Sequence, residues 1–453
     1  MKLSRKFLFS TTALAIIPAM TLVFVADASA ATKTKTKAKE KTVATKPATS
    51  ESTPVAPAAS TNNFFNDFPE GSLGYAIASG KPWVNIRYRY EYVSQDGFSE
   101  DAYASTIRTK LGYKTALWNG FQVAVEGENV AVIGADHYNS TVNGKTTFPT
   151  VSDPDDTDLN QLYISYQGLA KTNITVGRQL INLDNQRFIG AVDWRQNDQT
   201  FDAATISSQI IDKANLFYGY VRKVNRITGP SATNGAYESD SHLINASYEF
   251  DPALKIAAYD YALDFDDAAS SSSNTYGARL TGKYALNSDF SLVYAGEYAR
   301  QSDYGSNTAN YDENYYLIEP GVSWNGFTAK AGYEVLEGNG TSAFQTPLDT
   351  LHAFNGWADK FLTTPANGLE DRYGSLAYKV PFGDSWVKGT DLVVAYHDFQ
   401  AEHTGADYGT EWNASIQQTF YDRVTLGLKF ADYNADTFGA DTTKVITTVQ
   451  FKY

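Results

Sequence analysis

The chain has 453 residues, of which 37 are basic and 51 acidic, and it contains no cysteine. The absence of cysteine excludes disulfides and thiolate metal sites. The first 60 residues hold nine of the basic and three of the acidic residues. Residues 61–453 therefore contain 28 basic and 48 acidic residues, which gives a net charge of −20. This acidic balance argues against nucleic acid as a partner.

Residues 1–30 have the pattern of a secretory signal peptide. Three basic residues among the first six precede an apolar run at 7–25, and Ala28, Ser29 and Ala30 form a small-x-small cleavage site. The alternative is a transmembrane anchor, which fits less well because polar residues shorten the apolar run. We therefore expect cleavage after Ala30.

Residues 31–60 are rich in Lys, Thr, Ala, Pro and Ser. Six lysines face only two acidic residues, and the segment has almost nothing to bury. Such a composition predicts a disordered periplasmic tether. An interaction of its lysines with anionic polymers is the alternative.

Residues 61–453 are predicted to be all-β, because the chain carries 31 Tyr, 25 Phe and 33 Gly but only 2 Met. In residues 84–92, Val, Ile and three Tyr alternate with Asn, two Arg and Glu. A period of two places these sets on opposite faces of a strand. A transmembrane barrel turns its apolar face to lipid and its polar face to a wet lumen. We therefore expect Ile86, Tyr88 and Tyr90 to face lipid, and Arg87 and Arg89 the lumen.

The same alternation recurs along the chain and predicts a closed antiparallel barrel of about eighteen strands. The expected strands are 82–94, 102–117, 120–134, 157–168, 172–179, 201–209, 213–224, 240–250, 253–264, 275–286, 288–300, 311–324, 326–337, 371–381, 389–400, 409–420, 422–432 and 443–453. Short and long connections alternate, as short periplasmic turns and longer outer loops do in outer-membrane barrels. Trp83, Trp118, Trp324 and Trp386 fall at the predicted periplasmic ends, where an aromatic girdle is expected.

One long connection, at 180–200, interrupts this pattern with mixed charged, amide and apolar residues. Long insertions between strands usually carry function. We expect this loop to fold into or over the mouth of the pore, with its arginines meeting the solute, and the loop at 338–370 to cover part of the mouth. The alternative is that Asp184, Asp193 and Asp198 neutralise the arginines.

Several long motifs resemble the alginate-export-type outer-membrane porin family. They are Gly-Arg-Gln at 177–179, Asn-Gln-Arg-Phe-Ile-Gly at 185–190, Trp-Arg-Gln-Asn-Asp-Gln-Thr-Phe-Asp at 194–202, Ala-Phe-Gln-Thr-Pro-Leu at 343–348 and His-Ala-Phe-Asn-Gly-Trp-Ala-Asp-Lys-Phe at 352–361. The resemblance runs over most of residues 70–453. It implies an eighteen-stranded barrel that passes a solute through the bacterial outer membrane.

The predicted function is a channel for small or oligomeric hydrophilic solutes, with anionic saccharides such as alginate and organic acids among them. The candidate pore-lining and solute-binding residues are Arg87, Arg89, Arg108, Lys110, Glu126, Glu128, Arg178, Arg187 and Arg195. The expected partners are the solute, outer-membrane lipid and the barrel assembly machinery. The last of these follows from the aromatic end of the strand at 443–453, which resembles an assembly signal.

Other chemistry finds less support in the sequence. The five histidines show no metal-ligand spacing, and no nucleophile motif is present, so we expect no catalytic residue, metal or cofactor. An acidic cluster at 153–158 lacks the EF-hand spacing of a Ca²⁺ loop. The alternative functions are an adhesin or structural barrel and, with less support, an outer-membrane hydrolase.

Overall fold

The computed structural model describes residues 68–453 with the exception of residue 385. The predicted signal peptide at 1–30 and the tether at 31–60 lie outside the described residues. The described part begins with a short helix, α1 (Leu73–Ala78), that the sequence analysis did not predict. The hydroxyl of Ser72 caps it by accepting a 3.1 Å hydrogen bond from the backbone N–H of Tyr75.

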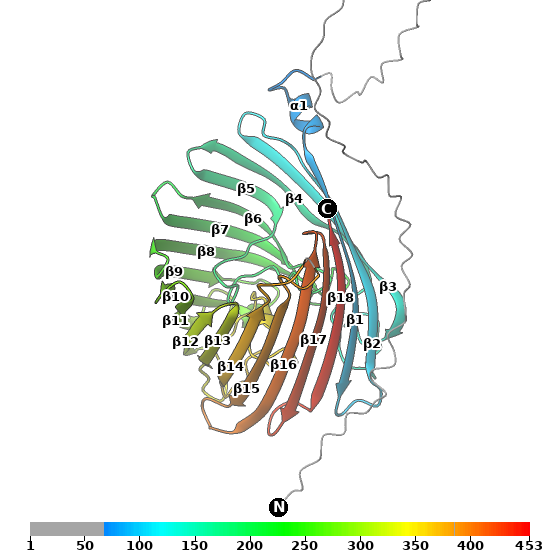
Figure 1. The fold of residues 1–453 in the computed structure, drawn as a ribbon, viewed down its shortest axis with the longest axis vertical. Coiled ribbons are helices and arrows are strands. Elements are labelled where there is room, and N and C mark those ends of the chain that lie inside the picture. The colour runs from blue at the N-terminus through cyan, green and yellow to red at the C-terminus, as the bar shows by residue number, and fades with distance from the viewer. Residues whose placement is uncertain (1–67, 385) are drawn as a thin grey trace, which may run out of the picture. The chain divides into compact units, whose positions relative to one another are not determined.

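The described residues then form eighteen strands in one antiparallel sheet (Figure 1). The strands are β1 (Lys81–Gln95), β2 (Ala102–Lys114), β3 (Phe121–His137), β4 (Asp156–Leu169), β5 (Thr172–Gln179), β6 (Thr200–Ser208), β7 (Ala214–Asn225), β8 (Ala236–Asp251), β9 (Leu254–Leu263), β10 (Ser273–Ala285), β11 (Phe290–Asp303), β12 (Asp312–Trp324), β13 (Phe327–Leu336), β14 (Leu369–Lys379), β15 (Asp391–Gln400), β16 (Asp407–Phe420), β17 (Val424–Ala435) and β18 (Thr442–Lys452). Two 3₁₀ turns, η2 (Ala269–Ser271) and η3 (Leu351–Ala353), lie in loops. Within the described residues, no helix has the length and apolar character to cross a membrane.

The sheet closes on itself through the pairing of β1 with β18, which lie side by side in Figure 1. The register runs from Asn85 opposite Lys452 to Gln95 opposite Thr442. Because β1 also pairs with β2, both of its edges are occupied. The predicted fold, a closed antiparallel barrel of eighteen strands, is therefore confirmed.

The connections alternate in length as predicted along most of the barrel; the exception is the connection at 380–390, on the side of the short turns, which is longer than the one at 401–406. The turn between β4 and β5 spans 170–171, whereas the connection between β5 and β6 spans 180–199. The connection between β13 and β14, at 337–368, is longer still. Short turns lie at the end of the barrel where β1 begins and β18 ends, and the long loops lie at the other end.

Side chains on β1 alternate between an inner and an outer face. Arg87 and Arg89 are 6% and 5% exposed, whereas Ile86, Tyr88 and Tyr90 between and beside them are partly exposed. Across the barrel the outer face carries large exposed apolar side chains, which lipid covers in a transmembrane barrel. Examples are Leu111, Leu162, Ile164, Leu216, Ile318 and Val394.

Trp83 is the exception to the predicted aromatic girdle, because it shares the inner face with Arg87. A Cβ atom on Gly112 of β2 would overlap the Trp83 ring, so the ring lies over that glycine. Its indole N–H donates to the Glu126 carboxylate on β3. The polar neighbours Asn85 and Arg87, two and four residues further on, already indicate this facing.

The interior of the barrel contains an apolar cluster as well as polar groups. Phe188, in the loop 180–199, lies 5.3 Å from Tyr259 on β9, 5.4 Å from Tyr315 on β12 and 5.9 Å from Phe344 in the loop 337–368, measured between ring centroids. Inward positions on β9 and β12 carry these aromatic rings, so the wall offers the loops an apolar surface. Part of the interior is therefore packed with side chains, where a wet lumen was expected.

Candidate functional site

The loop 180–199 folds into the barrel and is bound by basic residues of the wall. Arg87 on β1 donates from Nε to the side chain of Gln196, at 3.0 Å, and from Nη1 to the carbonyl of Asp193, at 2.8 Å. Gln196 in turn donates to Thr106 Oγ1 on β2, at 2.9 Å. Arg108 on β2 lies 3.4 Å from the carbonyl of Arg195. These contacts satisfy buried backbone carbonyls of the loop, so they hold it inside the barrel.

Arg195 is the centre of a buried ionic network. Its guanidinium lies 3.0 Å from Glu91 on β1, 3.6 Å from Asp153 in the loop 138–155 and 3.4 Å from Asp359 in the loop 337–368. Asp153 also lies 3.5 Å from Arg89. Arg195 therefore joins the wall and three of the long connections.

The pKa values in this network favour the charged forms. Burial works to lower the pKa of Arg195, but Glu91, Asp153 and Asp359 raise it above its ordinary value. Burial likewise works to raise the pKa of Asp153, but Arg195 and Arg89 hold it below its ordinary value. Arg195 and Asp153 therefore remain ionised at neutral pH, because for both of them the opposite charges outweigh desolvation.

Arg187 anchors the same loop to the opposite side of the interior. Its guanidinium lies 2.8 Å from Glu334 on β13 and 2.9 Å from Asp349 in the loop 337–368, and it donates to Asn355 Oδ1 at 3.0 Å. It also lies 4.7 Å from the centre of the Phe354 ring. Burial raises the pKa of the Asp349 carboxyl to about 7, although Arg187 acts to lower it.

A second polar cluster lies on the inner face of β2, β3 and β4. Lys110 lies 3.1 Å from Glu128 and also contacts Asp198 of the loop, which lies 3.6 Å from Arg108. Glu126 accepts hydrogen bonds from Asn160 at 2.8 Å and from Gln161 at 2.9 Å. All of these wall residues are buried beneath the loop or paired within the wall.

The predicted set is therefore brought together with one exception, Arg178. It shares the outer face of β5 with Val176, which is 50% exposed, and pairs with Asp202 on the outer face of β6 at 2.7 Å. Arg178 is thus not among the residues that face the interior, and the expectation that it lines the pore was wrong. Its place follows from the strand period, because Ile174, Val176 and Arg178 fall on one face.

The loop arginines have carboxylate partners, but not those of the alternative stated above. Asp184 accepts a hydrogen bond from Asn245, and Asp198 pairs with Arg108 and Lys110 of the wall. The carboxylate of Asp193 forms no ion pair within the described residues. The carboxylates that neutralise Arg187 and Arg195 come instead from the wall and from other loops. These carboxylates belong to Glu91, Asp153, Glu334, Asp349 and Asp359. They could not be predicted from the sequence, because they lie far from the loop along the chain.

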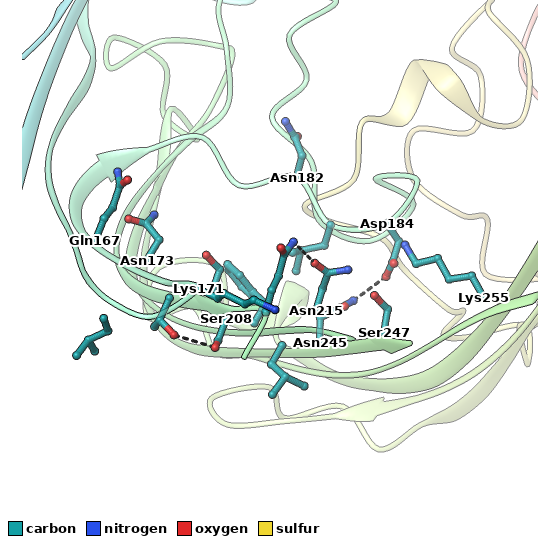
Figure 2. Close-up of a pocket in the computed structure, with 17 residues that line it drawn as sticks. Gln167, Lys171, Asn173, Asn182, Asp184, Ser208, Asn215, Asn245, Ser247 and Lys255 are labelled. Atoms are coloured by element: carbon teal, nitrogen blue, oxygen red, sulfur yellow. Dashed lines mark hydrogen bonds between the residues drawn. The ribbon is translucent and has the colours of Figure 1, made fainter. Parts of the chain in front are cut away.

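The open space in the interior lies along another part of the wall. A cavity of about 650 Å³ is bounded by the ends of β4–β9 near the short turns and by residues 182–184 of the loop (Figure 2). Smaller hollows continue from it past Lys255 to the inner face of β10, where Arg279 and Thr281 lie, and on to Lys330 of β13. None of the nine predicted site residues lines the large cavity.

A family model described as Alginate export matches residues 83–335, which is more than half of the chain. The chain belongs to the alginate export family. No curated protein matches it. The matched residues run from β1 to β13 and include the loop 180–199.

Solved structures share the fold of this alginate export family member. OpdL of Pseudomonas aeruginosa has 18% sequence identity and a TM-score of 0.64, and the alignment covers 83% of this chain and 99% of that one. OpdO of the same organism has 15% sequence identity and a TM-score of 0.66, and the alignment covers 83% of this chain and 98% of that one. OccAB2 of Acinetobacter baumannii has 17% sequence identity and a TM-score of 0.65, with 83% of this chain and 99% of that one covered. Family and fold together make the chain a bacterial outer-membrane β-barrel of a channel family.

Proposed function

We propose that this barrel is a diffusion channel for small hydrophilic solutes, narrowed from within by the loops 180–199 and 337–368. The observation that carries the proposal is that loop 180–199 is bound to β1, β2 and β13 inside the barrel, while a polar cavity stays open beneath it. An eighteen-stranded barrel is wide enough for a channel, and internal loops restrict it.

The charges along the open side support a channel of low charge selectivity. Lys255 and Lys283 make no ion pair within the described part of the chain, whereas Lys330 lies 2.8 Å from Glu319 and Arg279 pairs with Glu297. The loop arginines expected to meet alginate or organic acids, Arg187 and Arg195, are occupied by protein carboxylates. An anionic solute would therefore depend on Lys255 and Lys283 and on Lys171 of the cavity lining, which makes no ion pair within the described residues either.

The test is single-channel conductance of the purified barrel in a planar bilayer, before and after deletion of residues 183–197. The deletion is expected to raise conductance, because it removes the inward part of the loop. Removing residues 231–233 from the loop between β7 and β8 is the control and should leave conductance unchanged. A conducting barrel whose conductance does not rise would show that the loop is no constriction, and an intact barrel without conductance would favour an adhesive or structural role.

A further inference from the structure

The large cavity beneath the loop 180–199 has a lining of unusual composition. Seventeen residues surround it, of which six carry amides, four carry hydroxyls and only three are charged. The charged residues are Lys171, Asp184 and Lys255, so the formal net charge of the lining is only +1. A lining of neutral donors and acceptors suits a ligand with many hydroxyl groups, because amides both donate and accept.

Several of these polar groups have a donor or an acceptor that makes no hydrogen bond to another described residue. Asn182 uses its oxygen to accept from the Ala191 N–H at 2.7 Å, and its NH₂ group has no partner in the described residues. Asn173 donates to Thr175 at 3.0 Å, but its oxygen is buried and has no partner. The hydroxyl of Ser247 makes no side-chain hydrogen bond to any described residue. The Asn173 oxygen is the buried member of this group, so a ligand or a water must satisfy it, since unpaired buried polar atoms are unfavourable.

Other lining groups are already held in place by one another. Asn245 donates to Asp184 Oδ2 at 2.6 Å and to the Tyr261 hydroxyl at 2.9 Å. Gln209 donates to Asn215 Oδ1 at 2.6 Å. Figure 2 shows Asn182 and Asp184 approaching from the loop, and Asn215, Asn245 and Ser247 from the strands. The loop and the wall thus present polar groups to one space from two sides.

An aromatic ring completes the lining. Phe217 on β7 faces inward and is half-buried, packed at the margin of the apolar cluster that holds Phe188. A Cβ on Gly219 would lie 3.2 Å from the Phe217 ring, so the glycine leaves room for the ring against the strand. An aromatic face beside hydroxyl-binding amides is the combination that contacts both the C–H face and the hydroxyl rim of a sugar ring.

We infer that this cavity is a binding site for a neutral polyhydroxylated solute, one or two sugar rings in size, on the path through the channel. The inference rests on the proposed channel function and names a solute class for it. A strongly anionic ligand fits less well, because Asp184 opposes the two lysines and amides cannot neutralise charge. A purely apolar ligand would leave the amides unsatisfied.

The experiment measures block of single-channel current by maltose and cellobiose, with tetraethylene glycol as a neutral, flexible control and glucuronate as an anionic one. Phe217→Ala should raise the half-blocking sugar concentration by about five- to tenfold, the scale of a lost aromatic contact. Asn215→Ala should raise it in the same direction. Tyr218→Ala, which alters the neighbouring residue on the outer face, is the matched control and should change it less than about twofold.

Equilibrium binding of the same sugars to the detergent-solubilised barrel, followed by calorimetry, separates this inference from the channel function. Sugar binding that Phe217→Ala weakens, in a barrel that does not conduct, would support the site and overturn the channel. A conducting barrel that the glycol blocks as well as sugars do, or that glucuronate blocks best, would overturn the site and leave the channel standing. Equal sugar block in Phe217→Ala and Tyr218→Ala would also overturn it.

Discussion

The guanidinium of Arg195 lies 3.0 Å from the carboxylate of Glu91, so a residue of the internal loop is paired with the first strand of the barrel. Both side chains are buried, and Asp153 and Asp359 complete the surroundings of the arginine. Removal of one partner of a buried ionic network leaves the other charges uncompensated. The loop position should therefore depend on this one side chain.

Arg195→Gln is expected to release the loop, at a local cost of about 3–5 kcal/mol. The barrel should still assemble, since its strands pair independently of the loop. Single-channel recordings should show larger conductance with frequent transitions between levels. Arg300→Gln is the control, because Arg300 forms a solvent-exposed pair with Asp312, and exposed pairs contribute little to stability. A steady, wild-type current in Arg195→Gln would show that the network does not hold the loop.

Gly190 marks a close approach between the two internal loops. Its N–H donates to the Leu348 carbonyl at 2.8 Å, and a Cβ would lie 2.2 Å from Thr350 Oγ1. Gly190→Ala should separate the loops and raise conductance in an intact barrel. Adding Thr350→Ala removes the nearest clashing atom and should bring the current back towards that of the wild type, although a contact of 2.9 Å with Gln186 Cβ remains. If the double variant behaves like Gly190→Ala, crowding at Thr350 is not the cause.

Two buried groups in the loop 337–368 should have opposite effects on its stability as pH changes. Burial raises the pKa of Asp349 from 3.8 to about 7, against Arg187, so its contribution is present at low pH and is lost as pH rises through 7. Burial lowers the pKa of His352 from 6.5 to about 3, so its contribution is lost as pH falls towards 3. Between pH 3.8 and 6.5 the two dependences oppose each other.

Single substitutions should expose each dependence. In Asp349→Asn, hydrogen-exchange protection of the loop amides should fall as pH is lowered from 6.5, because His352 then acts alone. In His352→Gln, protection should rise over the same change, because Asp349 then acts alone. Protection factors, which correct for the intrinsic pH dependence of exchange, are the measurement. The same slope in both variants would refute the assignment.

The free lysines should control ion selectivity. Lys255→Gln combined with Lys283→Gln is expected to shift the reversal potential in a salt gradient towards cation preference, because positive charge on the open side is lost. Arg195→Lys keeps the charge of the occluded network and should leave the reversal potential close to that of the wild type. A shift in Arg195→Lys without one in the lysine variant would place the selective charges beneath the loop instead.

The lipid-facing assignment of the outer face can be tested by placing an arginine at two different depths along β1. Tyr88→Arg should impair assembly by about 2–4 kcal/mol, because its position is on the outer face near the middle of β1. Ser94→Arg alters the same face near the end of that strand and should cost about 0–1 kcal/mol. Heat-modifiable migration on gels reports the folded fraction. Equal folding of the two variants would contradict the assigned facing.

Much of the barrel was predictable because strand alternation is a local property. The pattern of residues 84–92 predicted both the strand and the inward facing of Arg87 and Arg89. The same rule also places Arg178 with Val176 on the outer face, so that error was avoidable. The partners of Arg195 were not predictable, because Glu91 and Asp359 reach it only through the folding of separate segments.

The pairing of β1 with β18 has a kinetic consequence. The two strands come from opposite ends of the described chain, so this contact has the largest sequence separation in the sheet. Chain closure of that length is slow, and both strands remain unpaired edges until it occurs. Such edges are templates for aggregation. The rate at which β1 finds β18 should therefore decide how much of the newly made chain reaches the folded state, whatever the stability of the finished barrel.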